Sequence, residues 1–444
     1  MTLGESQILL IEKVRNYLKE EFEKKNDLSL SSLIYFCSFA FTPGYAILKL
    51  WKQQKEVFLA IKVIFKEVMT LSNLAGYRIL NSNESINYHY NKIIVTWASR
   101  KNFSQNQGLV DKYFNFSSNE TEQTLWFVIY RDEILPSTIP NNVILFGRKK
   151  LRIKYNPVVF INLIIRCLIK SKFSIKKFVH SIFWHSQFAI VVKKSFKKIL
   201  KPDIKLVLMP YEGQTFQTAI ISELHKYNNK IKINGYIHSY PSLPTHLINR
   251  KDIPINLIIS GKDQFEMFTK FLGWRKDKIK FLSSSRFLKT DFDNMGGFIF
   301  LPINIVSPKK IISLFKILEK EINTKSIANL VIKDHPRSVS PKNNEWVVRD
   351  LKKMFKSDKD KETKKKLNYS VVVGATMAVI EALEKNVKVY HICEDPILEC
   401  YDEKLWPSIK CKKINENIFE YSLINKGNLI QFGNKDEIIN NYLQ

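Results

Sequence analysis

The pattern of apolar and polar positions predicts helices at the beginning of the chain. Apolar residues recur three to five positions apart from Leu9 to Phe22, and a second periodic stretch runs from Leu48 to Leu74. This spacing places apolar side chains on one face of a helix. We therefore expect residues 1–90 to form a helical N-terminal appendage.

A different pattern begins at Lys92, where short β-branched and aromatic runs alternate with stretches of helix or loop length. Runs that are apolar on both faces are typical of parallel strands inside a sheet. The expected strands are Lys92–Trp97, Leu125–Tyr130, Val143–Phe146, Leu206–Met209, Ile233–His238 and Leu257–Ser260. They indicate a first α/β domain over residues 91–285.

A second alternating series follows a loop that we expect after Ser283–Arg286. Its expected strands are Gly297–Pro302, Leu330–Lys333, Ser370–Val373 and Val387–Ile392, and its expected helices are Lys309–Thr324, Trp346–Phe355 and Ala375–Lys385. A chain of 444 residues is long enough for more than one core. We predict an α/β protein with two facing, doubly wound, Rossmann-like domains, the second over residues 286–444.

Charge adds an expectation about partners. The chain carries 70 Lys and Arg against 42 Asp and Glu, a formal net charge of +28. Such an excess indicates an anionic partner, although a compositional bias toward Lys, Asn and Ile explains it as well. The sequence contains no paired-cysteine zinc module, aromatic RNA-binding strand motif or leucine-zipper pattern, so we do not expect nucleic acid as a partner.

The beginning of the chain and its cysteines indicate a cytoplasmic protein. Five glutamates interrupt the apolar positions of the first 25 residues, unlike the apolar core of a secretory signal. The five cysteines are an odd number without a C-x-x-C pair, and we interpret them as reduced packing residues. No uncharged apolar run reaches the length of about 18 residues that a membrane span needs.

One lysine-rich segment indicates a membrane surface. Residues Val158–Leu200 are periodic and cationic, so one face can pack in the protein while the other lies on anionic headgroups at the inner face of a membrane. The alternative is an ordinary helix whose charged face is solvated.

Candidate chemistry follows from the rule that open α/β sheets bind ligands beyond the carboxyl ends of their strands. Lys333, His335 and Arg337 crowd the turn after Leu330–Lys333, and Pro336 fixes the backbone next to His335. Lysine and arginine attract phosphate oxygens, and histidine can donate to a leaving oxygen. We therefore expect a phosphate site at this strand end.

A second candidate turn follows Ser370–Val373. Gly374, Ala375 and Thr376 lead into a predicted helix, whose first N–H groups together with the Thr376 hydroxyl suit an anion. Thr376 is equally interpretable as an ordinary helix cap. Glu381, farther along this helix, is placed to accept hydrogen bonds from ribose hydroxyls, or is simply a surface residue.

The first domain supplies a candidate base. Glu212 follows the strand Leu206–Met209 on a turn that Gly213 permits, and a carboxylate there can take a proton from an acceptor hydroxyl. His238 and Ser239 end another strand of the same domain, so we expect them to line the same crevice. His238 is either an assistant in catalysis or a structural histidine.

These motifs together resemble the GT-B-type glycosyltransferases of bacterial surface polysaccharides. The chain is most similar to the sialyltransferase, polysialyltransferase and Kdo transferase group, which use CMP-linked acidic sugars. Residues 91–400 carry the resemblance, through His335-Pro336, Thr376 and Glu212-Gly213. Tyr211 stands where the family pattern has a second acid, and Thr376 is a single hydroxyl in a motif that is rich in them.

The resemblance implies an enzyme in which Glu212 deprotonates the acceptor while His335 and Thr376 hold the donor phosphate. It implies neither a metal nor a cofactor, since the nucleotide-sugar is a substrate. The acceptor would be a glycan, lipid-linked or at the end of a polysaccharide. A transferase for glycerol phosphate or for a nucleoside-diphosphate sugar, and a non-catalytic membrane-surface protein, are the remaining alternatives.

Overall fold

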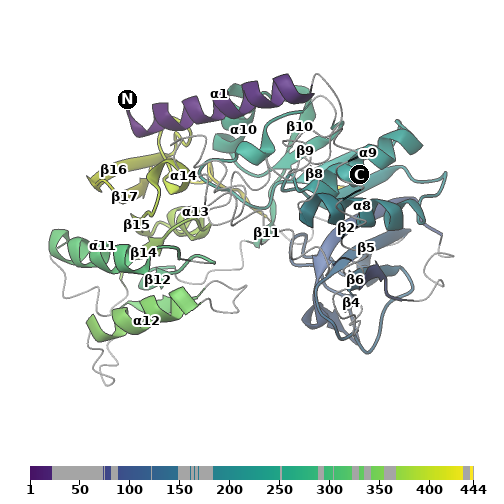
Figure 1. Ribbon diagram of the computed structural model, residues 1–444, viewed down its shortest axis with the longest axis horizontal. Helices are drawn as coiled ribbons and strands as arrows, with labels where there is room; N and C mark the ends of the chain where they lie inside the picture. Colours follow the sequence, from purple (N-terminus) through teal and green to yellow (C-terminus); the bar gives the residue numbers. More distant parts are fainter. Residues whose placement is uncertain are drawn as a thin grey trace.

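The computed structural model describes residues 1–22, 74, 76–81, 89–121, 123–148, 161, 165, 169, 184–250, 253–288, 295–303, 305–322, 330–334, 342–354, 367–433 and 441–443. Within these ranges the chain forms two lobes side by side, which Figure 1 shows. An eight-stranded sheet forms the first lobe, and a six-stranded sheet forms the second. The predicted α/β class is therefore confirmed.

The sheet of the first lobe has the order β1-β6-β5-β2-β7-β8-β9-β10. Its strands are β1 (Tyr77–Ile79), β2 (Lys92–Ala98), β5 (Thr124–Tyr130), β6 (Val143–Arg148), β7 (Leu206–Pro210), β8 (Lys232–Tyr236), β9 (Asn256–Ile259) and β10 (Ile279–Phe281). All neighbours are parallel except β1 and β6. The chain adds β5 and β6 on one side of β2, then crosses to add β7–β10 on the other. Chain order therefore reverses between β2 and β7.

Helices cover one face of this sheet. Every residue of β5 is buried, as expected for a central parallel strand. The helices α8 (Trp184–Lys197) and α9 (Thr215–Tyr227) pack together over one face. The connection from β2 to β5 covers the other with Phe114 and Phe116, joined by Tyr442. In its described part this connection forms η2 (Arg100–Asn102), β3 (Phe103–Ser104), β4 (Gly108–Leu109) and η3 (Ser118–Glu120).

The sheet of the second lobe has the order β13-β12-β14-β15-β17-β16. Its strands are β12 (Phe298–Phe300), β13 (Val331–Lys333), β14 (Tyr369–Val373), β15 (Lys388–Ile392), β16 (Ile409–Asn415) and β17 (Ile418–Leu423). The first four are parallel, and β16 and β17 form an antiparallel hairpin. Chain order reverses between β12 and β14.

The helices of the second lobe lie on both sides of its sheet. They are α11 (Pro308–Glu321), α12 (Lys342–Met354), α13 (Ala378–Glu384) and α14 (Pro396–Glu399). Apolar residues of α11 and α12 pack in a core of their own with β12 and β14. Residues of α13 and α14 instead join the core that faces the first lobe.

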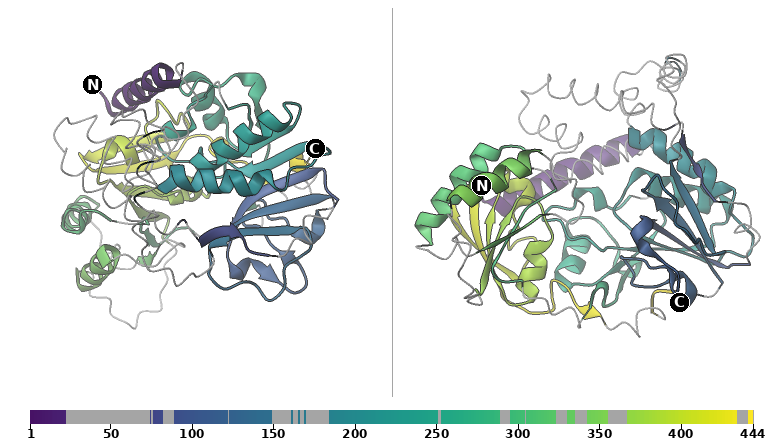
Figure 2. Two further views of the ribbon diagram at one scale, coloured as in Figure 1. Left: turned by 45° about the vertical axis from the view of Figure 1, so that its right-hand side comes forward. Right: turned by 90° about the horizontal axis from the view of Figure 1, so that it is seen from below.

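Two elements connect the lobes. Figure 2 shows that α1 (Leu3–Phe22) runs across both. The Gln7 amide donates to the Cys400 carbonyl at 2.8 Å in the second lobe, and Arg15 donates to the Phe271 carbonyl at 3.3 Å, just beyond α10 (Lys262–Lys270) of the first. The strand β11 (Ser284–Leu288) leaves the first lobe and pairs with β18 (Phe432–Gly433) as the chain returns.

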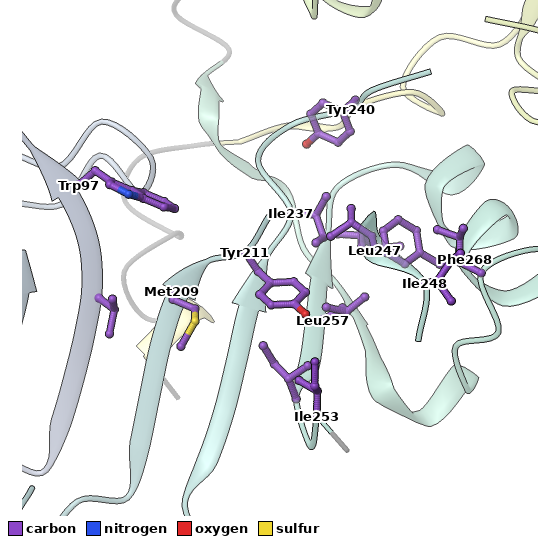
Figure 3. Packing of buried hydrophobic residues seen from close by; sticks show 14 of the residues in the cluster. Trp97, Met209, Tyr211, Ile237, Tyr240, Leu247, Ile248, Ile253, Leu257 and Phe268 are labelled. Carbon is purple, nitrogen blue, oxygen red and sulfur yellow. The ribbon is translucent and has the colours of Figure 1, made fainter. Parts of the chain in front are cut away.

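One apolar core is shared by the two lobes. Ile237 and Leu247 of the first lobe belong to the same buried cluster as Val379 and Trp406 of the second. Figure 3 shows the first-lobe part of this cluster around Trp97, Ile237 and Phe268, among others. A buried hydrogen bond of 2.7 Å from the Tyr401 hydroxyl to the Tyr240 carbonyl also joins the lobes.

Several strands of the structure were not predicted. The strand β1 lies in the segment expected to be entirely helical, β10 was not expected, and β11 reaches into the start of the loop expected after Arg286. The hairpin β16–β17 was not predicted. The periodic residues 48–73 and most of 149–183 lie outside the described residues. No helix in the described ranges is long and apolar enough to cross a bilayer.

Candidate functional site

Glu212 and His238 are in hydrogen-bond contact at the carboxyl end of the first sheet. Glu212 lies two residues beyond β7, and His238 lies two residues beyond the neighbouring strand β8. His238 Nε2 is 2.9 Å from Glu212 Oε1, and the two side chains are 3% and 12% exposed. The sequence predicted that both residues line one crevice, and the structure brings them into direct contact.

The turn that carries Glu212 is fixed by its own side chains. Gln217 Oε1 accepts hydrogen bonds of 3.0 Å from the backbone N–H groups of both Glu212 and Gln214. The Gln214 side chain donates to Glu212 Oε2. Gly213 has a φ of +63°, and any Cβ there would overlap the carbonyl oxygen of His246. Gly213 is therefore required by both backbone conformation and space.

The environment of His238 keeps its imidazole neutral. Burial lowers the pKa of His238, the nearby Glu212 carboxylate only partly offsets this, and the positive charge of Arg286 lowers the pKa further. A neutral ring whose Nε2 carries the proton donates to Glu212 and orients that carboxylate. The Tyr113 ring packs edge-on against His238 at a centroid distance of 4.5 Å.

Tyr113 comes from the connection after β2, and a buried carboxylate holds it in place. Asp111 accepts hydrogen bonds of 2.7 Å from the backbone N–H groups of Tyr113 and Phe114, and another from the Thr96 hydroxyl. Burial raises the pKa of Asp111 to about 6 although these bonds lower it. Tyr113 also lies 5.4 Å from the ring of Trp97 on β2. Side chains from β2, β7 and β8 thus converge where chain order reverses.

The predicted turn Gly374–Thr376 lies at the corresponding reversal of the second sheet, beyond β14. Gly374 has a φ of +62° and lies against Pro302, which follows β12. His391 Nε2 is 2.8 Å from the Gly374 carbonyl oxygen. Burial lowers the pKa of His391 to about 4, so its ring is neutral and structural.

Thr376 lies one residue before Met377, the N-cap residue of α13. The Thr376 hydroxyl oxygen accepts a hydrogen bond of 3.3 Å from the N–H of Ala378, where the seven-residue helix α13 begins. The hydroxyl proton is left to donate elsewhere. Glu381, predicted as a ribose ligand or a surface residue, pairs with Lys385 at 3.3 Å.

A buried carboxyl that the sequence did not indicate lies beside this turn. Glu399 is 1% exposed, and its Oε2 accepts a hydrogen bond of 2.7 Å from the N–H of Glu394. Its Oε1 has no hydrogen-bond partner among the described residues. Burial, reinforced by the negative charge of Glu394, raises the pKa of Glu399 to about 8. The group is therefore a neutral acid at pH 7.

The turn after β13, which begins at Lys333, is only partly described. The Lys333 ammonium lies 3.6 Å from the ring centroid of Phe298, over the neighbouring strand β12. His335, Pro336 and Arg337 lie outside the described residues, so their predicted roles remain predictions. A shallow cavity of about 430 Å³ opens between the first turns of α11 and α12 and is lined by Ser307, Pro308, Lys309, Asn343 and Trp346.

The two strand-end sites face each other through Arg286 of β11. Arg286 Nη1 is 3.3 Å from the carbonyl oxygen of His238 and 3.7 Å from the sulfur of Met377. Met377 directly follows Thr376, so one side chain reaches both sites. Ser239, predicted to line the crevice, has a buried hydroxyl oxygen without a hydrogen-bond partner in the described part of the chain.

Comparisons with known proteins do not place the chain in a family. No protein-family model matches the sequence, and no curated protein matches it.

Proposed function

We propose that the protein is a glycosyltransferase of GT-B type, which transfers an acidic sugar from a CMP-linked donor to a glycan hydroxyl. In this proposal the two lobes are Rossmann-like domains, the first for the acceptor and the second for the nucleotide. The acceptor is a lipid-linked glycan or a growing surface polysaccharide, such as a capsule or lipopolysaccharide. The enzyme works in the cytoplasm, at the inner face of the membrane.

The contact between Glu212 and His238 carries the proposal. Burying a carboxylate beside a histidine costs free energy that an apolar pair would not cost, so such pairs concentrate where chemistry needs them. This one lies at the reversal of chain order in the first sheet, the position at which open α/β sheets bind ligands. Arg286 connects it to the corresponding position of the second sheet.

The reaction needs one proton acceptor in the first lobe. An acceptor hydroxyl attacks the anomeric carbon, and its proton passes to the Glu212 carboxylate as the new C–O bond forms. The bond from the anomeric carbon to the phosphate oxygen breaks, and its electron pair leaves with CMP. His238 and Gln214 each donate a hydrogen bond to Glu212, so they hold its lone pairs toward the crevice.

The second lobe contains hydrogen-bonding groups that suit a ligand at a strand end. Thr376 retains a hydroxyl proton for a phosphate oxygen. The cavity between α11 and α12 falls within the range of about 300–1,000 Å³ of ligand pockets, and Trp346 and Lys309 line it. An aromatic ring and a cation suit the base and phosphate of a nucleotide.

The nucleotide is tested first. Melting temperatures are measured with CMP, CDP and UDP, since a ligand that binds only the folded state must stabilise it. We expect CMP to raise the melting temperature most. A response to CDP or UDP alone would replace the CMP-linked donor with a diphosphate donor such as CDP-glycerol or a UDP-sugar. No response to any nucleotide would contradict the proposal.

The base is tested by replacement with its amide. Glu212→Gln should lower kcat by about 10²- to 10⁴-fold and leave CMP affinity within a factor of two, because only proton transfer is lost. Glu223→Gln is the matched control. Glu223 is 11% exposed and lies 2.9 Å from Lys193, between α9 and α8, so it is buried and paired like Glu212 but lies outside the crevice. Full turnover by Glu212→Gln would refute the assignment.

A further inference from the structure

Arg286 occupies a fixed position between the lobes. Its neighbours on β11 are buried and hydrogen-bonded to the first lobe. The Ser285 hydroxyl donates to the Tyr113 carbonyl at 2.8 Å, and the Ser284 hydroxyl lies 2.9 Å from the Tyr236 hydroxyl. Backbone fixed in this way directs the Arg286 side chain into the junction, where it contacts His238 and Met377.

Arg286 is half-buried, and its guanidinium has no compensating acid among the described residues. No carboxylate of the described residues lies within ion-pair distance of it. A guanidinium has five N–H donors, and within the described part of the chain their only oxygen acceptor is the His238 carbonyl at 3.3 Å. Charged groups removed from water are normally paired with an opposite charge. The position therefore suits an anion that arrives with a ligand.

The surroundings of Arg286 also suit an anion. The buried Ser239 hydroxyl oxygen follows His238 in the chain and accepts no hydrogen bond in the described part of the structure. The Phe287 ring lies 5.3 Å from the Arg286 guanidinium carbon and restricts the plane of that group. The planar guanidinium of Arg286 lies between the two strand-end sites, and its geometry suits hydrogen bonds to two oxygens of a phosphate or a carboxylate.

We propose that Arg286 binds an oxyanion of the substrate between the two lobes, either the phosphate of the nucleotide or the carboxylate of the acidic sugar. This inference rests on the proposed function and adds a residue that the resemblance did not indicate. Arg286 is an anion-binding residue in this scheme and takes no proton. The positive charge of Arg286 also lowers the pKa of His238. The same guanidinium would therefore act on both the ligand anion and the Glu212–His238 pair.

The test measures affinity in three variants. Arg286→Lys keeps the positive charge but removes the ability to donate two parallel hydrogen bonds, and Arg286→Gln removes the charge. Arg275→Gln is the control. The Arg275 guanidinium is exposed and donates two hydrogen bonds, of 2.9 and 2.8 Å, to the Asp277 carboxylate. Dissociation constants for CMP and for a CMP-linked acidic sugar are measured by titration calorimetry. Losing a charge-assisted hydrogen bond should weaken binding about 10- to 100-fold in Arg286→Gln, with a smaller loss in Arg286→Lys.

The pattern across ligands identifies the anion. Equal losses for CMP and the sugar nucleotide indicate the phosphate, and a loss for the sugar nucleotide alone indicates the carboxylate. Affinities within a factor of two of the wild-type protein for both ligands in both variants would overturn the proposal. Arg286→Lys keeps the test valid if Arg286→Gln does not fold.

An independent measurement separates this inference from the proposed function. If the wild-type protein binds no nucleotide, the glycosyltransferase proposal fails, and inorganic phosphate is then titrated with the melting temperature as readout. Stabilisation of the wild-type and Arg275→Gln proteins but not of Arg286→Gln would still support an anion site at Arg286. No difference between the variants in phosphate would overturn it.

Discussion

Both sheets reverse their chain order at corresponding places, and the side chains gathered at the two reversals differ in kind. Between β2 and β7 the first lobe presents Glu212, bonded to His238 and Gln214. Between β12 and β14 the second lobe presents a glycine turn, the Thr376 hydroxyl and the neutral acid Glu399. The first reversal thus presents a hydrogen-bonded carboxylate, whereas the second presents uncharged hydrogen-bonding groups.

This difference teaches where the charge for the proposed anionic ligand would come from. At the described second-lobe turn there is no cation, and the Lys333 ammonium rests on the Phe298 ring. Arg286 comes instead from β11, the strand that joins the lobes. The proposed site would therefore be complete only when both lobes and their connection are in place.

The largest effect that we expect concerns the turn of the first reversal. Gly213→Ala places a Cβ at positive φ and against the His246 carbonyl. The left-handed backbone alone costs about 1–2 kcal/mol, and we expect about 3 kcal/mol or more in denaturant unfolding because the carbonyl must also move. Gly273→Ala, at a φ of +75° with nothing within 4 Å, should incur the backbone cost alone. Equal losses would show that the turn can relax.

The next effect measures the pair itself. Glu212→Gln, His238→Ala and the double variant form a thermodynamic cycle for unfolding. Residues in direct contact typically couple by about 0.5–3 kcal/mol, and we expect a value in this range. The cycle of Glu223→Gln with His238→Ala should be additive within about 0.5 kcal/mol. Additivity in the first cycle would mean that His238 does not hold Glu212.

The raised pKa of Glu399, at the second reversal, should make the free energy of unfolding depend on pH. The pKa of Glu399 is about 8 in the folded protein against an ordinary 4.5, so the folded state binds a proton that the unfolded state releases between these values. Stability should therefore fall as the pH rises through this window, by about 1.4 kcal/mol per pH unit. Glu399→Gln should remove this slope, which urea unfolding from pH 5 to pH 8 measures. Glu416→Gln, exposed on the β16–β17 hairpin, should keep it.

The smallest effect separates two interpretations of Thr376. Thr376→Val should cost about 1 kcal/mol in stability through the lost hydrogen bond from the Ala378 N–H, and Thr376→Ser should cost little. If the hydroxyl also binds phosphate, Thr376→Val should lose CMP affinity and Thr376→Ser should retain it. Unchanged affinity in Thr376→Val would mean that the Thr376 hydroxyl serves only to accept the hydrogen bond from Ala378.

The sequence predicted the buried strands well because they are apolar on both faces. The strand expected at Leu206–Met209 is observed as β7 (Leu206–Pro210), and the strand expected at Ser370–Val373 is observed as β14 (Tyr369–Val373). The hairpin β16–β17 was missed, although the alternation in Ile418–Leu423 (IFEYSL) is a signal for a half-buried strand. The alternation of β16 is weaker because lysines dominate it.

The candidate site was predictable only where it follows such strands. Glu212 and His238 were both expected at strand ends, but their contact depends on β7 and β8 being neighbours, which no local pattern encodes. Arg286 lies in a connecting strand that pairs with a distant segment, so local sequence gives it no role. Glu399 ends a four-residue helix, and only the folded structure reveals that it is buried.

The core that runs from one lobe into the other has a consequence for how the protein unfolds. Ile237 and Val379 belong to one buried cluster, so neither lobe can open without exposing apolar surface of its neighbour. Melting should consequently be cooperative across the whole molecule, with a single calorimetric transition rather than one for each sheet. Damage to either half then lowers the stability of both.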